Sequence, residues 1–323
     1  MKKIALLIHE DVVLSTVAGA LDMLIHTNRY LQSIGKPPAF KITLAGEEQQ
    51  NNLLHVATQF LEYKTLDDAA DADLVVIPAF YGNPDLVFKK HNIALEWIRD
   101  MYQQGAELAS LCCGSYMLAQ AGLLTGKTCT SHWRDIEDLQ QRYPDVNFFS
   151  HRVITDQDGI YTSGGAFSSL NLMLYIIEKV CGREMGVWAS KMFSLDIDRV
   201  NQSHFAIFEG QRCHSDEEIL KAQTYIEQSY HAEITVEDVA EKVNMSKRNF
   251  IRRFKKATQN TPLEYLQRVK IEAAKKALER NEQSISSLMY ETGYNDVKTF
   301  RYVFKRLTGL TPQDYRRKFS REA

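Results

Sequence analysis

A segment that occurs twice near the C-terminus, at an offset of 50 residues, restricts the fold of this chain more than any other feature. Each copy holds a basic helical pattern with two phenylalanines four residues apart, followed by a Thr-Pro pair and a tyrosine. The repeated positions are Phe250, Phe254, Thr261, Pro262 and Tyr265, and then Phe300, Phe304, Thr311, Pro312 and Tyr315. Two copies of a basic helical unit predict an all-α domain with two helix-turn-helix units that reads duplex DNA.

The first copy has the pattern of a helix, a turn and a second helix. Residues 236–243 place apolar side chains on one face, and Asn244 and Met245 form the turn. Ser246 can cap the next helix by accepting a backbone N–H. In that helix the two phenylalanines anchor one face, and the other positions carry cations without an acidic residue: Lys247, Arg248, Arg252, Arg253, Lys255 and Lys256.

The second copy predicts a support helix over 284–290, a turn over 291–294 and a reading helix over 295–307. Before the phenylalanines the offset falls to 49, which pairs Asn244 with Gly293 at the turn. A glycine suits a left-handed turn position, because it has no Cβ. The cations of this helix are Lys298, Arg301, Lys305 and Arg306.

Between the copies, residues 262–280 contain no Gly and no Pro after the first position, which predicts one continuous helix. At 1.5 Å per residue it spans roughly 30 Å, close to the ~34 Å between successive major grooves on one face of B-DNA. A rigid helix of this length can hold both readers in adjacent grooves. The alternative is that these cations do not bind DNA and only lie on the solvated faces of ordinary helices. That explanation fits a single basic helix better than a duplicated one.

The DNA-binding residues are expected near the start and on the outer faces of the two reading helices. Those best placed for base edges are Lys247, Arg248, Asn249, Asp296, Lys298 and Thr299. Others can contact bases or phosphates: Arg252, Arg253, Arg301 and Lys305. The predicted set is completed by the residues that begin the two helices, Ser246 and Asn295.

Residues 234–319 resemble the DNA-binding domain of AraC-family transcription regulators. The resemblance is carried by Glu291-Thr292-Gly293-Tyr294-Asn295, Phe304-Lys305-Arg306 and Thr311-Pro312. It implies a monomeric seven-helix module whose two reading helices enter neighbouring major grooves.

The two parts of this 323-residue chain differ in net charge. The net charge is −2, but residues 216–323 carry 21 Lys plus Arg against 16 Asp plus Glu, or +5, which leaves −7 for residues 1–215. Because an acidic surface repels phosphate, DNA contact is assigned to the second part. The apolar run 4–8 is too short for a signal peptide or a membrane span, so a cytoplasmic protein is expected.

The first part alternates strand-like and helical patterns, which predicts an α/β sandwich with a parallel, flavodoxin-like sheet covered by helices on both faces. Strands are expected over 4–8, 40–45, 74–78 and 108–112, and helices over 15–31, 86–102, 115–121 and 167–180. Ligands of such folds bind at the carboxyl ends of strands.

The strand that ends at Cys112 turns abruptly into a helix at Leu111-Cys112-Cys113-Gly114-Ser115. Such an elbow can expose a side chain beside a helix N-terminus and lower a thiol pKa. Together with residues 118–127 and Thr130-Ser131-His132-Trp133, it resembles the PfpI-like branch of the class I glutamine amidotransferase-like fold. The order of the two domains resembles the GlxA-like subgroup of AraC regulators.

That fold includes cysteine enzymes, but four positions of this chain depart from them. Thr16 stands where the enzymes often have a carboxylate, and Cys113 where the proteases have a histidine. Bulky Phe80 replaces a glycine that lets backbone N–H groups approach an oxyanion, and Asn171 stands where the subgroup has Asp. His132 is interpreted as a pocket or core residue, with a catalytic base as the alternative.

The sequence therefore predicts a DNA-binding transcription regulator with a sensory and dimerisation domain at 1–195, a linker at 196–215 and an AraC-type domain at 216–323. A small-molecule effector is expected near Cys112, Cys113, His132, Thr16 and Phe80, beside the aromatic rings of Tyr81, Trp133 and Phe167. A homodimer and RNA polymerase are the expected protein partners.

No metal or organic cofactor is expected, because metal-ligand spacing is absent among the five cysteines, Cys112, Cys113, Cys129, Cys181 and Cys213. Two alternatives stay open. One is a cysteine-dependent hydrolase or glyoxalase-like enzyme fused to a DNA-binding tail, and the other is a regulator whose first domain binds no ligand and serves only for dimerisation.

Overall fold

The structure is a computed structural model that describes residues 1–47, 61–165, 167–198, 200–212, 214–280 and 283–320. The chain forms two compact units, Met1–Gln202 and Ser203–Ala323. Their boundary falls inside the stretch predicted as a linker, and Cys213 lies outside the described residues. Within the described ranges, no helix is both long and apolar enough to cross a membrane.

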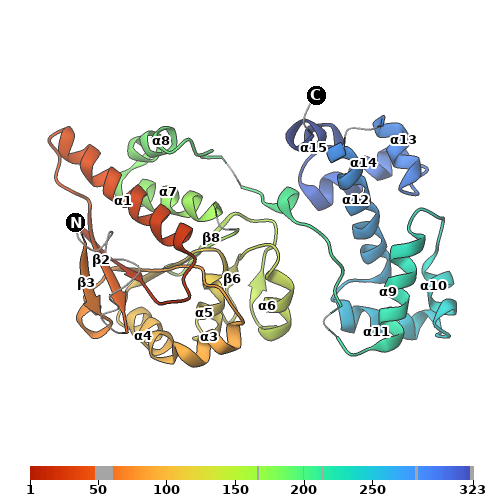
Figure 1. The fold of residues 1–323 in the computed structure, drawn as a ribbon, viewed down its shortest axis with the longest axis horizontal. Helices are drawn as coiled ribbons and strands as arrows, with labels where there is room; N and C mark the ends of the chain where they lie inside the picture. The colour runs from red at the N-terminus through yellow and green to blue at the C-terminus, as the bar shows by residue number, and fades with distance from the viewer. Residues whose placement is uncertain (48–60, 166, 199, 213, 281–282, 321–323) are drawn as a thin grey trace. The chain divides into compact units, whose positions relative to one another are not determined.

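The first unit is built on a seven-stranded sheet of order β3-β2-β1-β4-β5-β9-β8 (Figure 1). Its strands are β1 (Lys2–Leu7), β2 (Phe40–Gly46), β3 (Glu62–Thr65), β4 (Leu74–Ile77), β5 (Glu107–Ser110), β8 (Ile154–Gln157) and β9 (Ile160–Ser163). A second, two-stranded sheet joins β6 (Thr128–Cys129) to β7 (Asn147–Phe148).

The predicted parallel sheet is confirmed: the pairing is parallel throughout the large sheet except between β8 and β9, which are antiparallel. These two strands form a hairpin with a two-residue turn, in which Asp158 (φ 51°) and Gly159 (φ 74°) are both left-handed. An Asp-Gly pair with two positive φ angles matches the right-handed twist of the flanking strands.

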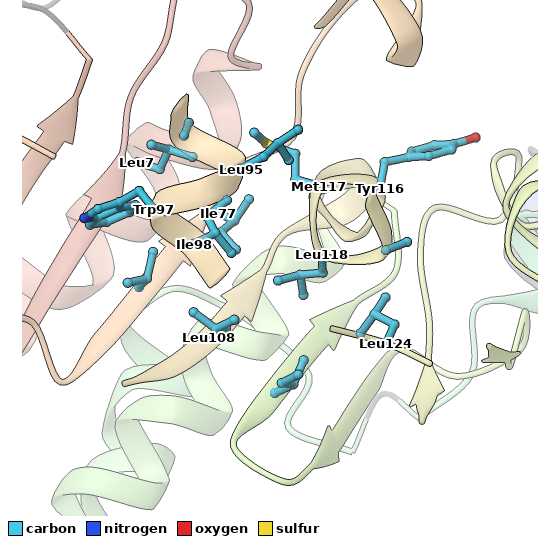
Figure 2. Close-up of a cluster of buried hydrophobic side chains, with 14 of the residues drawn as sticks. Leu7, Ile77, Leu95, Trp97, Ile98, Leu108, Tyr116, Met117, Leu118 and Leu124 are labelled. Atoms are coloured by element: carbon cyan, nitrogen blue, oxygen red, sulfur yellow. The ribbon is translucent and has the colours of Figure 1, made fainter. Parts of the chain in front are cut away.

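Helices cover both faces of the sheet, as predicted. One face carries α1 (Leu14–Ser33), α7 (Ser168–Cys181) and α8 (Arg183–Met192), and the other carries α3 (Pro84–Lys90), α4 (Asn92–Gln103), α5 (Ser115–Gln120) and α6 (Ile136–Arg142). Successive strand residues point to opposite faces, so Leu7 and Ile77 pack against α4 and α5 (Figure 2), whereas Leu6 and Val76 pack against α1 and α7.

The helix predicted over 86–102 is two helices that meet at His91. His91 leaves the helical conformation (φ −111°, ψ 40°), and its ring is buried against Asp11 and His9. The interruption comes from a tertiary contact that a periodic pattern does not contain.

Seven α-helices make up the described part of the second unit, as the resemblance implies. They are α9 (Glu217–Ser229), α10 (Val236–Lys242), α11 (Lys247–Thr258), α12 (Pro262–Arg280), α13 (Ile285–Glu291), α14 (Val297–Thr308) and α15 (Pro312–Phe319). Two separate cores form around Phe250 and Phe254 and around Phe300 and Phe304. Helix α12 has the bounds predicted from the sequence and contributes side chains to both cores.

Candidate functional site

The two reading helices are held by the same aromatic arrangement. In the first copy the rings of Phe254 and Tyr265 are 5.3 Å apart at 81°, and in the second Phe304 and Tyr315 are 5.5 Å apart at 83°. All four side chains are buried. Edge-to-face packing fixes the rotation of each helix about its axis, so the opposite face of each helix is fixed toward solvent.

The turns before and after the reading helices also repeat. The residue pairs related by the repeat, Asn244 with Gly293 and Gln259 with Gly309, all adopt left-handed conformations, with φ between 52° and 77°. The left-handed conformation expected at Gly293 is confirmed. A Cβ there would lie 2.8 Å from Nζ of Lys270, which donates a 2.8 Å hydrogen bond to the Gly293 carbonyl.

Two predicted DNA-binding residues cap the reading helices. Ser246 accepts a hydrogen bond from the Asn249 backbone N–H, and Asp296 accepts one of 2.6 Å from Thr299. Helix α14 therefore begins at Val297, two residues later than predicted, because the short side chain of Asp296 satisfies the first turn. Asn295 precedes the helix, and its amide contacts Glu233.

The outer face of α11 is cationic. Its exposed lysines and arginines are Lys247, Arg248, Arg252, Lys255 and Lys256. The Arg252 guanidinium donates a 2.9 Å hydrogen bond to the side chain of Asn249, and Lys247 pairs with Glu237. Arg252 and Asn249 thus form a joined polar surface one turn into the helix.

Arg253 is arranged differently from its neighbour. Its guanidinium makes two hydrogen bonds with Asp216, Nη2 to Oδ1 at 2.6 Å and Nε to Oδ2 at 3.0 Å. The same carboxylate caps α9 through the backbone N–H of Ile219. The structure therefore places Arg253 in a contact between α11 and α9, although the sequence assigns it to DNA.

The outer face of α14 carries Lys298, Thr299, Arg301, Lys305 and Arg306, all exposed. Tyr302, which the sequence analysis did not single out, is 66% exposed on the same helix. Its offset of 50 residues from Arg252 was the signal that could have identified it. The residue that corresponds to Arg253 is Val303, which is buried, whereas Arg253 itself is half-buried against Asp216.

The elbow in the first unit has the expected backbone but not the expected exposure. Cys112 is left-handed (φ 55°), a conformation that costs free energy for a residue with a Cβ. Its side chain is buried, and its backbone N–H donates to Oγ of Ser163 at 3.2 Å. Interaction with the Cys113 thiol and burial raise the pKa of Cys112, so this elbow neither exposes nor acidifies its thiol.

Three of the predicted ligand-binding residues meet beside the elbow. The Thr16 hydroxyl donates to the Val13 carbonyl at 2.7 Å and accepts from the Ala79 N–H at 3.2 Å. The Phe80 N–H donates to Sγ of Cys113 at 3.4 Å, and the Phe80 ring is buried in the core. Thr16 thus acts as an internal hydrogen-bonding residue, and the backbone donor of Phe80 is already used.

His132 lies on a neighbouring segment that Ser131 ties to the elbow through a 3.2 Å hydrogen bond to the Cys112 carbonyl. Its Nδ1 accepts from the Arg134 N–H at 3.1 Å. Across the described part of the chain, no hydrogen bond or ion pair joins His132 to either elbow thiol. Burial lowers the pKa of His132, which favours the neutral ring.

A carboxylate that the sequence analysis missed belongs to the same region. Burial raises the pKa of Asp135 to about 6, and its charge disfavours ionisation of both thiols. No local sequence signal marks this burial. Of the aromatic residues expected around a ligand, Trp133 is partly buried, whereas Tyr81 and Phe167 are 65% and 71% exposed.

Comparison with protein families matches both units. The DJ-1/PfpI family matches residues 3–179, and a helix-turn-helix domain matches residues 239–318. The HTH-type transcriptional regulator GbdR of Pseudomonas aeruginosa (strain UCBPP-PA14) is 26% identical over 251 residues, which cover 77% of this chain and 67% of that protein. The HTH-type transcriptional regulator GlxA of Rhizobium meliloti (strain 1021) is 25% identical over 234 residues, 68% of each chain.

Among solved structures, the crystal structure of an AraC family transcriptional regulator from Pseudomonas putida superposes with a TM-score of 0.50 at 17% identity. The superposition covers 60% of this chain and all of that one, and it supports the fold of the first unit. With these matches and the duplicated helix-turn-helix geometry, the chain belongs to the DJ-1/PfpI family and is a DNA-binding transcription regulator with an AraC-type helix-turn-helix module.

Proposed function

We propose that α11 and α14 read two successive major grooves on one face of an operator, which makes recognition sequence-specific. The observation that carries this proposal is the repeat itself: two helices, each held by the same buried aromatic pair, present cations on the opposite face. Helix α12 has 19 residues, or roughly 28 Å at 1.5 Å per residue. This length suits the spacing of adjacent major grooves.

Within each reader the proposed roles follow the position of each residue on the outer face of the helix. Arg248, Asn249 and Arg252 of α11 are assigned to base edges, and Lys298 and Thr299 take the corresponding positions on α14. The remaining exposed cations of both helices are assigned mainly to phosphates: Lys247, Lys255, Lys256, Arg301, Lys305 and Arg306. The residues that cap or precede the helices, Ser246, Asn295 and Asp296, fix the first turn against the backbone of DNA. Arg253 acts through its contact with Asp216 as a positioning residue.

The first unit is proposed to bind a small-molecule effector beside the elbow and to form the homodimer that presents two pairs of readers to tandem half-sites. Support comes from two half-buried groups whose charges interact, the Cys113 thiol and Asp135, and from half-buried His132 on the segment that Ser131 ties to the elbow. We also propose that the protein recruits RNA polymerase and is located in the cytoplasm.

No catalytic role is proposed for Cys112. Its thiol is buried, its pKa is raised, and Thr16 offers a hydroxyl already bonded to Val13 in place of a carboxylate. Without a base or a carboxylate partner, a thiol is not activated as a nucleophile. Effector binding therefore changes the equilibrium between DNA-binding states instead of leading to turnover.

Genome-wide mapping of DNA bound by the full chain tests the proposal, followed by footprinting of the strongest site. We expect protection in two adjacent major grooves, and the Cys112→Ser variant should retain it. Protection of a single groove would contradict the role of the second reader. Loss of a measurable hydrolase or glyoxalase turnover in Cys112→Ser would favour the enzyme instead.

A further inference from the structure

A second cluster of chemically active side chains lies at the end of β1, separate from the elbow thiols. His9 and Asp11 belong to the loop that follows the strand, and His91 joins α3 to α4. The ring centroids of the two histidines are 4.4 Å apart, and Nε2 of His91 is 2.9 Å from Oδ2 of Asp11. One possible ligand atom from each residue lies within 4.8 Å of the other two.

The burial of these histidines lacks an explanation within the described chain. His9 and His91 are each only 4% exposed. Among the described residues, neither ring nitrogen of His9 has a hydrogen-bond partner, and Nδ1 of His91 has none either. A buried polar atom without a partner costs about 1–3 kcal/mol, so three of them in one place indicate a partner of another kind.

We propose that His9, Asp11 and His91 form a binding site for a first-row divalent transition metal ion, with Zn²⁺ as the representative. Two imidazoles and one carboxylate are a donor set that such ions prefer, whereas Mg²⁺ and Ca²⁺ prefer oxygen ligands. Distances below 4.8 Å between ligand atoms allow convergence on one ion with small side-chain rotations.

Two charged neighbours of the proposed site, Glu47 and Lys90, should affect metal binding in opposite directions. Oε1 of Glu47 is 3.8 Å from Nδ1 of His91, close enough to orient that ring or to supply a further ligand. Lys90 opposes the ion, since its Nζ lies 3.1 Å from Oδ2 of Asp11. The same ammonium is 2.6 Å from Glu10, so it can keep that partner when Asp11 turns toward a metal.

The loop that holds these ligands is tied to the segment beside the elbow. The Val13 N–H donates to Ala79 at 2.7 Å, and the Tyr81 N–H donates to Asp11 at 2.8 Å. Phe80, between them, contacts Cys113. A metal that fixes this loop therefore also restrains one wall of the proposed effector region.

The experiment measures Zn²⁺ and Co²⁺ binding to the full chain after treatment with a chelator and dialysis, by calorimetry and by the visible spectrum of Co²⁺. We expect one ion per chain, a concentration-dependent rise in Tm, and no effect of Mg²⁺. His9→Leu and His91→Gln should each lower the affinity at least tenfold. His9→Leu is the more secure variant, because it replaces a buried ring without described hydrogen bonds by an apolar side chain of similar volume.

Two further variants separate this site from other ligands. Lys90→Met should tighten binding, because it removes the competing cation, and the exposed His231→Ala should leave binding unchanged. The proposal is overturned if the wild-type chain binds no Zn²⁺ saturably, or if His9→Leu and His91→Gln bind as the wild type does. A thiolate-to-cobalt charge-transfer band would assign the ion to the cysteines and would equally overturn it. DNA binding by the metal-free chain tests the proposed function separately.

Discussion

Two adjacent arginines with opposite structural settings give the sharpest prediction. Arg252 is exposed on α11 and contacts Asn249 of the same helix, whereas Arg253 is bound to Asp216 at the start of α9. We expect Arg252→Ala to lower operator affinity by roughly 1–3 kcal/mol, or about 5- to 150-fold, without a change in Tm. Arg253→Ala should lower Tm, because it removes the contact between two helices and leaves Asp216 without its guanidinium.

The salt dependence of operator affinity measures the contribution of Arg252 in a second, independent way. The two reading helices carry nine exposed lysines and arginines, five on α11 and four on α14. With about 0.9 counterions released per phosphate contact, the slope of log affinity against log salt has an upper limit near 8 in magnitude. Arg252→Ala should leave the slope unchanged if the guanidinium contacts a base, and should reduce it by about 0.9 if it contacts a phosphate.

The assay is fluorescence anisotropy with a mapped operator and a scrambled duplex, at several salt concentrations, together with thermal unfolding of each variant. Asp216→Asn serves as a matched control, because it weakens the Arg253 contact without altering a cation. Unchanged affinity in Arg252→Ala would refute the placement of this residue. So would an Arg253→Ala variant that loses as much affinity as Arg252→Ala while keeping its full Tm.

Three other changes test the two units. The Asp135 carboxyl has its pKa raised from 3.8 to about 6, so its contribution to the free energy of unfolding is present at low pH and lost as the pH rises through 6. Asp135→Asn should therefore stabilise the protein by up to about 2 kcal/mol at pH 7.5 but not at pH 4. An equal gain at both pH values in urea unfolding would exclude this cause. Gly293→Ala should destabilise the second helix-turn-helix by about 1–3 kcal/mol, because φ is 74° and a Cβ would meet Nζ of Lys270. A Tm equal to that of the wild type would show that alanine is not strained at this position. Lys275→Met removes the buried ammonium that lies 2.7 Å from the Glu272 carboxylate. It should lower the free energy of unfolding, measured with denaturant, by about 3 kcal/mol. An unchanged free energy of unfolding would show that water replaces the lysine.

The duplicated module could be predicted closely because local patterns and tertiary packing agree there. The phenylalanines that anchor each reader, the left-handed Gly293 and the bounds of α12 all follow from spacing and residue type. The repeat also distinguishes the two neighbouring arginines of the first reader. At an offset of 50, Arg253 corresponds to buried Val303, which indicates an inward position, and Arg252 corresponds to exposed Tyr302.

The first unit was harder to predict where long-range contacts override local patterns. The Asp158-Gly159 turn is a hairpin signal that predicts the antiparallel β8–β9 pair, and it could have been recognised. The interruption of a helix at His91 could not, because it follows from burial against residues 80 positions earlier. For the same reason, no spacing rule brings His9, Asp11 and His91 together.

Burial decided the chemistry of the elbow, and burial depends on the whole fold. The strand-to-helix turn at Cys112 was evident from the sequence, whereas the position of its side chain beneath neighbouring segments was not. The fold thus retains the strained backbone of an elbow while the thiol has a raised pKa.

Hydroxyl-radical footprinting of the full chain on its strongest genomic site tests the central claim most directly. Two readers joined by α12 should protect two patches on one face of the duplex, about ten base pairs apart. Arg252→Ala should weaken protection in one patch, and Lys298→Ala should weaken it in the other. A chain that prefers no genomic fragment over random duplex at moderate salt, with or without added cell extract, would contradict the account.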